Sequence, residues 1–366
     1  MTSYFRLISQ WFLEEIWAIP GRMIALVFII FIAYFPFISN NPYLLKVITL
    51  CNIFCIFAVS WDVLAGYTGQ FSLGHALFFG VGNYTVALLS LHLDLSPWIT
   101  IPLSGVAAIL MGLIAGISAL RLKGFYLALV TLCFPIILTG IVLVLGDFTG
   151  GDLGLSGWSS LTNSLVANYY INFLMMLVSV YVMYKLIDSG NKSLRVGIIL
   201  QAIREDEISA RTSGINTTGY KLLAFCISGF FAGIAGALYG LHIRVAGPSV
   251  LSLSFSFQVL LWTIFGGIGT IYGAVVGVFT LYPMMEFLQL HLFGEHLRFV
   301  VLALILIFTL LYMPEGITVW VRGRLEQECP RCRLKNMATR LHCRACRAPL
   351  RLKAEAPGAG MKGSES

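Results

Sequence analysis

Four cysteines near the end of the chain have the spacing of a metal site. Cys329 and Cys332 form one C-x2-C pair, and Cys343 and Cys346 form a second pair after ten intervening residues. Each pair can present two thiolates to one ion, and four thiolates complete the tetrahedral shell of a structural zinc site. The sequence therefore predicts a zinc-ribbon-like module over residues 325–353.

The surroundings of these cysteines favour zinc, although disulfides, redox chemistry, an iron site, or His342 in place of one cysteine are alternatives. A segment of about 25 residues has too small a core to fold without a staple, and a metal ion would supply one. We expect the following residues, 354–366, to be disordered. Flanking arginines would favour the thiolate form. They are Arg331, Arg333, Arg344 and Arg347.

A second chemically distinct stretch, residues 193–221, is dense in charge and lies between apolar segments long enough to cross a bilayer. Ionised groups at this density are costly in hydrocarbon, so the stretch is predicted to be a solvated loop. Its apolar residues roughly follow a 3.6-residue period, which predicts a helix ending near Gly214. Glu207 and Arg211 are spaced for a side-chain pair. The helix either links two spans or binds a cytoplasmic partner.

Two glycine-rich apolar segments carry polar residues that a simple membrane anchor does not need. They are GYTGQFSLGHALFFGVGNYTVALL at 66–89 and FGGIGTIYGAVVG at 265–277. Glycine lets helices approach closely or break, and polar residues at membrane depth line a cavity or pack within protein. The alternative is close packing without substrate contact. The candidates for a translocation path are Asp62, Gln70, Ser72, Gly74, His75, Asn83, Gly266, Gly267 and Gly269.

The composition determines what kind of structure must position these groups. Of 366 residues, 58% are hydrophobic and 11% are charged, whereas soluble domains are about one quarter charged. We therefore predict an all-α polytopic membrane protein with about ten transmembrane helices, some broken at the glycine-rich segments. The net charge of +7 does not indicate nucleic-acid binding, because 11 of the 24 Lys and Arg residues follow residue 320.

The predicted membrane domain covers residues 23–318 and follows an interfacial segment at residues 1–22. The expected spans are 23–38, 44–65, 71–93, 98–120, 125–145, 170–187, 222–241, two helices flanking 265–277, and 297–313. The Lys/Arg bias places the charged loop and both termini in the cytoplasm. The basic residues on that side before the tail are Arg6, Arg22, Arg121, Lys123, Lys185, Lys192, Arg195, Arg204, Arg211 and Lys221; only Lys46, Arg244 and Arg298 fall outside.

Five landmarks resemble, in order, those of the LivM-type permease subunits of branched-chain amino acid ABC transporters. They are GYTGQFSLGHALFFGVGNYTVALL, RLKGFYLALVTL, TGGDLGLSG, AIREDEISARTSGIN with the following YKLLAFCISGFFAGIAGALYG, and FGGIGTIYGAVVGV. The resemblance covers about residues 20–318. The cysteine-rich tail is not part of the family's usual pattern.

This resemblance implies one half of a heterodimeric pore in the inner membrane of a bacterium or archaeon. Its partners would be a LivH-like second permease, two cytoplasmic ATPase subunits and a periplasmic substrate-binding protein. The chain has no GxxxxGK[ST] phosphate loop, so ATP would act only through partner subunits. Residues 202–214 would be the coupling segment. Its candidate residues are Ala202, Arg204, Glu205, Asp206, Arg211 and Gly214.

Other functions remain as alternatives. Urea or a short-chain amide would suit an uncharged lining as well as branched-chain amino acids do. An ion-coupled carrier would need buried ion sites, for which Asp62 is the main candidate. The segment HLFGEH at 291–296 fits neither H-E-x-x-H nor H-x-x-E-H and does not indicate a metalloprotease. We expect a transport subunit, not an enzyme.

Overall fold

The structure is a computed structural model. It describes residues 20–39, 41–119, 122, 124–162, 164–187, 196–291, 295–332, 335–337, 342–343 and 346–350. Residues 1–19 of the predicted interfacial segment and the whole predicted disordered tail, 354–366, lie outside the described residues. The chain forms two compact units, residues 35–318 and residues 1–34 with 319–366. They are described separately.

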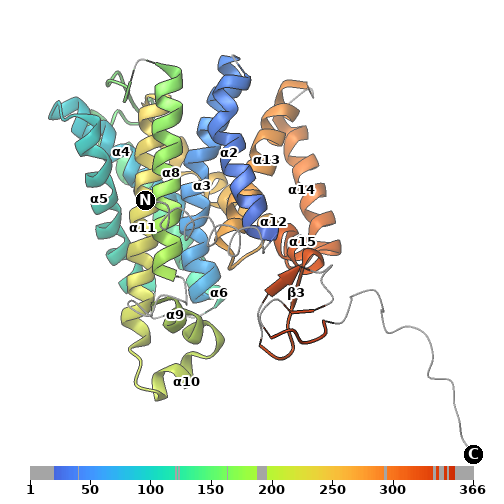
Figure 1. Cartoon of the computed structure of the whole chain (residues 1–366). Helices are drawn as coiled ribbons and strands as arrows, with labels where there is room; N and C mark the ends of the chain where they lie inside the picture. Colours follow the sequence, from blue (N-terminus) through green and yellow to red (C-terminus); the bar gives the residue numbers. More distant parts are fainter. Residues whose placement is uncertain are drawn as a thin grey trace, which may run out of the picture. The chain divides into compact units, whose positions relative to one another are not determined.

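The larger unit is a bundle whose long helices run side by side (Figure 1). Its helices are α3 (Pro42–Thr68), α4 (Ala76–His92), α5 (Pro97–Ala119), α6 (Phe125–Val144), α7 (Gly146–Thr149), α8 (Leu165–Ile187), α9 (Val196–Glu205), α10 (Glu207–Thr212), α11 (Thr217–Ile243), the 3-10 helix η2 (Pro248–Leu251), α12 (Leu253–Gly266), α13 (Ile271–His291) and α14 (Glu295–Tyr312). Helices α2 (Pro20–Ile38) and α15 (Ile317–Leu325) each cross the boundary between the units.

Helices α3 and α11 form the centre of the bundle and are its most buried long helices. Phe54 of α3 packs against Phe79, Trp262 and Tyr282, with ring centroids 5.0 to 6.3 Å away. Glycine brings α11 close to α4, because a Cβ on Gly236 would overlap the carbonyl oxygen of Phe79. Backbone-to-backbone packing of this kind is typical of helices in membranes.

Local capping residues explain where the two central helices begin and end. The Asn41 side chain accepts the N–H of Tyr43 at 3.0 Å and starts α3, while Gly69, with φ of 69°, ends it. The Asn216 side chain accepts the N–H of Gly219 at 3.0 Å and starts α11. Asparagine at the N-cap and glycine in the left-handed region after the last turn are the preferred residues at these positions.

Within the described residues, seven segments are long and apolar enough to cross a membrane. They are α3, α5, α6, α8, α11, the Ile271–Gln289 part of α13, and Ala303–Arg324. Three shorter apolar helices accompany them, so the predicted number of about ten spans is not confirmed. The outer helices expose large apolar side chains, for example Val144 at 86% and Leu174 at 60%, as lipid contact requires.

The helices are interrupted at both glycine-rich segments, as the sequence predicted. Residues 69–75 have irregular backbone before α4 begins at Ala76, so this helix is shorter than the expected span from residue 71. The second interruption lies between α12 and α13, where Gly267 and Gly269 have φ values of 120° and 77°. Only glycine adopts the first of these conformations readily.

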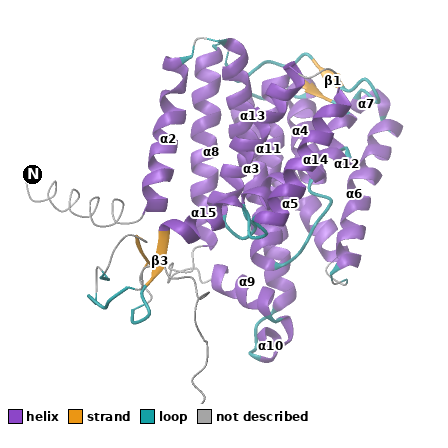
Figure 2. Ribbon diagram, turned by 90° about the vertical axis from the view of Figure 1, so that its right-hand side faces the viewer, coloured by secondary structure: helices purple, strands orange, loops and turns teal. Residues whose placement is uncertain are grey.

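A small β ladder lies at the end of the bundle away from α9 and α10 (Figure 2). Strand β1 (Leu155–Ser156) pairs antiparallel with β2 (Val245–Ala246), with Leu155 opposite Ala246. Gly154 has φ of 71°, and a Cβ there would overlap the carbonyl oxygen of Ala246. The glycines of TGGDLGLSG therefore let this loop pack directly on the chain that follows α11.

The described part of the smaller unit contains a second β ladder. Strand β3 (Glu326–Glu328) pairs antiparallel with β4 (Lys335–Met337). Arg322 at the end of α15 binds Glu326 with an N–O distance of 2.8 Å. His342 forms an isolated bridge with Pro349. These contacts bring the chain back on itself and place the cysteines within one small fold.

Candidate coupling site

The charged loop folds into helices α9 and α10, which project from one end of the bundle (Figures 1 and 2). Helix α9 contacts α3, α8 and α11. Leu200 and Ile203 of α9 are buried, and a Cβ on Gly197 would overlap the carbonyl oxygen of Ile187 at the end of α8. The buried apolar residues of α9 thus pack against the membrane bundle of the same chain. Arg195 and residues 188–194 lie outside the described residues.

The predicted single helix is interrupted at Asp206, which has extended backbone and starts α10. Its carboxylate accepts the N–H of Ile208 at 2.8 Å, the N–H of Ser209 at 3.2 Å and the Ser209 hydroxyl at 2.6 Å. The hydroxyl and N–H groups of Ser209, together with the N–H of Ile208, hold the pKa of Asp206 below its ordinary value. Aspartate is a preferred N-cap, so the interruption is locally encoded.

Helix α10 is tied to the central helix α11 by Glu207. This carboxylate binds Arg211 at 3.1 Å, which confirms the predicted pair, and binds Lys221 at 2.9 Å. The Lys221 side chain is only 7% exposed and belongs to α11. Because water screens such a shielded pair less than a surface pair, it resists displacement of α10 from α11.

Arg204, the penultimate residue of α9, connects the loop to the end of α3. Its guanidinium Nη1 donates a hydrogen bond to the carbonyl oxygen of Gly66. The side chain also lies on Gly69, where a Cβ would come within 3.3 Å of the Arg204 Cγ atom. On the other side, a Cβ on Gly269 would lie 3.0 Å from Nη1. Arg204 therefore sits where the end of α3 meets the turn before α13.

Asp62 holds these same two segments together. It is fully buried, and its Oδ1 atom accepts the N–H of Gly269 at 2.7 Å. A Cβ on Gly66 would overlap Asp62 and lie 2.6 Å from the Gly269 nitrogen. The sequence placed Asp62 and Gly269 in a translocation path and Arg204 in a coupling segment. The structure brings all three into one cluster, which sequence periodicity did not predict.

His75 and Ser72, two further path candidates, make contacts inside the bundle. The Nε2 atom of His75 lies 2.9 Å from the hydroxyl of Ser60 on α3. The carbonyl oxygen of Ser72 accepts the indole N–H of Trp61 at 2.8 Å. Both residues are buried and bind consecutive residues of α3. They hold the irregular segment 69–75 against the last turns of that helix.

Other candidates lie at close helix contacts. A Cβ on Gly74 would overlap the carbonyl oxygen of Thr131 in α6. Asn83 of α4 is fully buried against α11, where a Cβ on Gly240 would lie 2.8 Å from its Oδ1 atom. Gln70 is partly exposed and follows α3 directly. Gly266, like Gly74, faces backbone: a Cβ there would overlap the carbonyl oxygen of Gly273.

Helices α9 and α10 also carry exposed residues that the described contacts to the bundle leave accessible. All six coupling candidates are exposed: Ala202, Arg204, Glu205, Asp206, Arg211 and Gly214. Ile208 on α10 is 70% exposed. Ile208 was not among the candidates expected from the sequence, although an isoleucine within a charged stretch is a detectable signal. An exposed isoleucine ringed by charges has the composition of a binding surface with an apolar centre and a polar rim.

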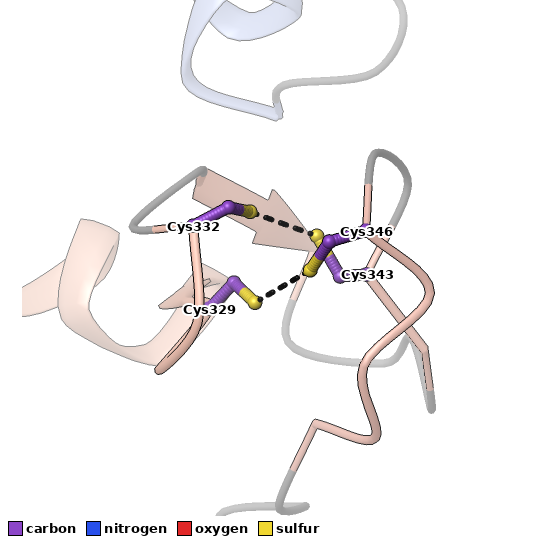
Figure 3. A group of neighbouring side chains, drawn as sticks. All are labelled: Cys329, Cys332, Cys343 and Cys346. Carbon is purple, nitrogen blue, oxygen red and sulfur yellow. Dashed lines mark hydrogen bonds between the residues drawn. The ribbon is translucent and has the colours of Figure 1, made fainter.

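The four tail cysteines converge in the smaller unit (Figure 3). Cys329 and Cys346 have sulfurs 3.4 Å apart, as have Cys332 and Cys343, and all four sulfurs lie within 4.8 Å of one another. Sulfurs about 2.3 Å from a tetrahedral zinc ion would be about 3.8 Å apart, whereas a disulfide needs about 2.05 Å. The geometry therefore fits four ligands around one ion.

The described core of this module consists mainly of the cysteines themselves. Cys329 and Cys343 are buried with Leu350, and Cys346 and Ala348 pack against them. The backbone N–H groups of Cys332 and Arg331 hold the pKa of Cys329 below its ordinary value, which favours the thiolate ligand. The apolar groups of these described residues are too few to offset the entropy of ordering them without a cross-link or a metal ion.

Comparison with known proteins identifies the family. The family model described as branched-chain amino acid transport system / permease component matches residues 43–310. The chain belongs to this permease family. The resemblance to LivM-type permeases is thereby confirmed, and the chain is a multi-pass membrane protein of a transport system. The match ends before the cysteine-rich tail, so family membership says nothing about the metal site.

Individual relatives agree with this assignment. The high-affinity branched-chain amino acid transport system permease protein LivM of Salmonella typhimurium is 28% identical over 307 residues, which cover 76% of this chain and 70% of the relative. LivH of the same organism is 26% identical over 77% of this chain and 94% of the relative. The ribose import permease protein RbsC of Haemophilus influenzae is 23% identical over 73% and 84%. No solved structure matches the chain.

Proposed function

We propose that this chain is the permease subunit of an ATP-driven ABC importer for branched-chain amino acids. The family, and the names of the LivM and LivH relatives, support the transported substrate. The observation that carries the ATP-driven mechanism is the loop of α9 and α10, which projects from the bundle yet is bonded to α3 and α11 through Arg204 and Glu207. A segment held in this way moves with the core when a partner pushes on it.

The proposed partners are a LivH-like second permease, two cytoplasmic ATPase subunits and a periplasmic substrate-binding protein. Residues 193–221 would face the cytoplasm, as would both termini, and the β1–β2 end would face outward. Ile208 would enter an apolar groove of the ATPase, while Glu205 and Arg211 would bind its rim. ATP hydrolysis would occur in those partners, because the chain lacks a phosphate loop.

Force would pass from the ATPase to the membrane core as rigid-body movement. Closure of the ATPase subunits would displace α10, and the Glu207–Lys221 pair would transmit that displacement to α11. Arg204 would transmit it to Gly66 and the cluster around Asp62. The bundle would then switch between inward-facing and outward-facing access. In this mechanism the glycine-rich segments support the wall of the translocation path, which lies between this chain and its LivH-like partner.

A transport assay of the complete reconstituted importer tests the proposal. Leucine, isoleucine and valine should compete with one another for uptake, and uptake should require ATP. Preferential uptake of urea or a short amide would instead support the alternative substrate class. Uptake that depends on an ion gradient, is abolished by ionophores and needs no ATPase subunits would support an ion-coupled carrier and contradict the proposal.

The tail would bind one zinc ion through Cys329, Cys332, Cys343 and Cys346. The mutual distances of the four sulfurs support this ligand set. His342 would not be a ligand, because four thiolates already complete a tetrahedral shell. The cytoplasmic location proposed for the tail also favours metal binding over disulfides, since that compartment is reducing. In this proposal residues 325–353 form a folded module attached to the membrane domain.

A further inference from the structure

A cavity lined by both polar and apolar groups opens at the end of the bundle opposite the coupling loop. Its volume is about 350 Å³, which falls in the range of small-molecule sites. Its lining includes Lys46 in the first turns of α3, Asn168 at the start of α8, and His242 and Arg244 at the end of α11. The loop carrying Ser160 lines a further part. Under the proposed orientation this cavity faces outward.

The charge of the cavity is one-sided. Lys46 and Arg244 both line it, and the lining contains no Asp or Glu. Within the described part of the chain, no carboxylate pairs with either side chain. Two cations that line one cavity without a carboxylate beside them favour an anionic ligand, and Arg and Lys bind carboxylates with charge-assisted hydrogen bonds. The cavity is therefore suited to a carboxylate.

Arg244 occupies a backbone position that would suit glycine better. It ends α11 with φ of 60° and ψ of 31°, in the left-handed region. Glycine is common there because it has no Cβ to crowd the backbone carbonyl oxygen, and asparagine is tolerated because its short side chain can form local hydrogen bonds. An arginine at this position places a cation in the cavity at a conformational cost, which is typical of residues held for function.

The rest of the lining matches the other parts of an amino acid. Leu165 and Ile243 provide apolar surface for an aliphatic side chain. The amide nitrogen of Asn168 lies 3.2 Å from Nδ1 of His242, and the Asn172 side chain below donates to Asn168 at 2.8 Å. Asn172 is 1% exposed, and its Oδ1 atom has no hydrogen-bond partner among the described residues. Polar groups thus continue from the cavity into the bundle.

We infer that this cavity is an outward-facing reception site for the α-carboxylate of an aliphatic amino acid, held between Lys46 and Arg244. The inference rests on the proposed function and deepens it by naming the part of the substrate that the permease itself recognises. It also separates the two substrate classes, because urea has no anionic group for this pair to bind.

The test is leucine binding to the complete transporter in nanodiscs, without ATP and without binding protein. Lys46→Gln and Arg244→Asn remove charge, and asparagine tolerates the left-handed conformation, so the end of α11 is preserved. Each should weaken leucine binding by about tenfold. Lys46→Arg and Arg244→Lys keep the charge and should stay within about threefold of wild type. Leucinol, which lacks the carboxylate, should bind wild type weakly and be insensitive to these changes.

Three outcomes would overturn the inference. The first is unchanged leucine binding in both uncharged variants while wild type transports leucine, which leaves the proposed function intact. The second is equal binding of leucine and leucinol by wild type, a comparison that needs no variant to fold. The third is that the uncharged variants bind leucine normally but need more binding protein for half-maximal stimulation of ATP hydrolysis. That result would mean that the cavity binds an acidic side chain of the substrate-binding protein. Failure of wild type to transport leucine would instead contradict the proposed function as well.

Discussion

The carboxylate of Asp62 accepts a hydrogen bond from the backbone N–H of Gly269 at 2.7 Å, although the two residues are 207 positions apart. This bond joins the last turns of α3 to the turn between α12 and α13. Arg204 of the charged loop donates to Gly66 at the same junction. Asp62 therefore holds two segments together at the end of the bundle next to α9. Movement of the loop would reach the membrane core first at this junction.

Ile208 provides the sharpest test of partner binding. Ile208→Asp should weaken ATPase binding by about tenfold or more, because it places a charge where an apolar contact is proposed. Since Ile208 is 70% exposed, the membrane domain should keep its thermal stability. The measurement is co-purification of ATPase subunits and their affinity in detergent.

Glu205→Lys is the companion variant for the polar rim and should weaken binding by a smaller factor. Asp206→Lys is a poor test of partner binding although Asp206 is exposed, because the Asp206 carboxylate caps α10 and its loss would disturb that helix. Ser213→Ala on the same loop is the matched control and should behave as wild type. Normal ATPase binding in both Ile208→Asp and Glu205→Lys would remove the basis for assigning α10 as the docking segment.

Arg204 should affect transmission more than binding. Arg204→Gln removes the charged donor to Gly66 but leaves the outer surface of α10 unchanged. We expect normal ATPase binding and about a tenfold loss of leucine moved per ATP hydrolysed, since hydrogen bonds to charged groups contribute about 1.5–3 kcal/mol. The measurement is the ratio of transport to hydrolysis in proteoliposomes.

Arg204→Lys supplies the control for charge. Lysine keeps the cation but lacks the planar donor group of arginine, so this variant should recover only part of the coupling. A ratio of transport to hydrolysis equal to that of wild type in Arg204→Gln would show that the link to Gly66 carries no force.

Gly74 tests the role of close backbone packing. Gly74→Leu should block transport, because its Cβ would overlap the backbone of α6. It should also lower the free energy of unfolding by at least about 3 kcal/mol, the upper end of the usual cost of overpacking. Gly140→Leu is a matched control in α6, since nothing lies within 4 Å of a Cβ there. The measurements are leucine uptake and thermal unfolding of both variants. Equal uptake and equal stability of the two variants would contradict the proposed role of close packing between Gly74 and α6.

Local sequence pattern predicted the features that depend on neighbours in the chain. The Glu207–Arg211 pair and the grouping of four cysteines follow from spacing alone. The break at Asp206 was also accessible, because aspartate followed three residues later by serine within a charged stretch is compatible with an N-cap. Our prediction of one continuous helix was based on the apolar period and did not use this capping signal.

Contacts between distant segments could not be predicted in the same way. Periodicity shows which face of a helix is apolar but not which helix covers it. The bonds from Asp62 to Gly269 and from Arg204 to Gly66 depend on how α3, α9 and the turn before α13 cross. The cavity of Lys46 and Arg244 likewise forms only when the ends of α3, α8 and α11 meet. In the sequence both residues stand out only as exceptions to the Lys/Arg bias.

The cysteine cluster makes a prediction that is independent of transport. The purified full-length chain, kept reduced, should contain about one zinc ion per molecule, because four thiolates within 4.8 Å complete a structural site. Cys343→Ser should lower the zinc content sharply and make residues 325–353 sensitive to protease, since the described core of that module consists mainly of its ligands. Cys133→Ser, which changes an exposed cysteine of α6 outside the cluster, is the control and should retain zinc.

Chelation should have the same effect as losing a ligand. Removal of zinc from wild type should expose the module to protease while the membrane domain keeps its melting temperature, because no ligand belongs to residues 35–318. Added zinc should restore protection in wild type but not in Cys343→Ser, since binding and folding of such small modules are linked. Elemental analysis that finds no zinc in the reduced protein, or equal zinc content in Cys343→Ser and wild type, would refute the four-cysteine site.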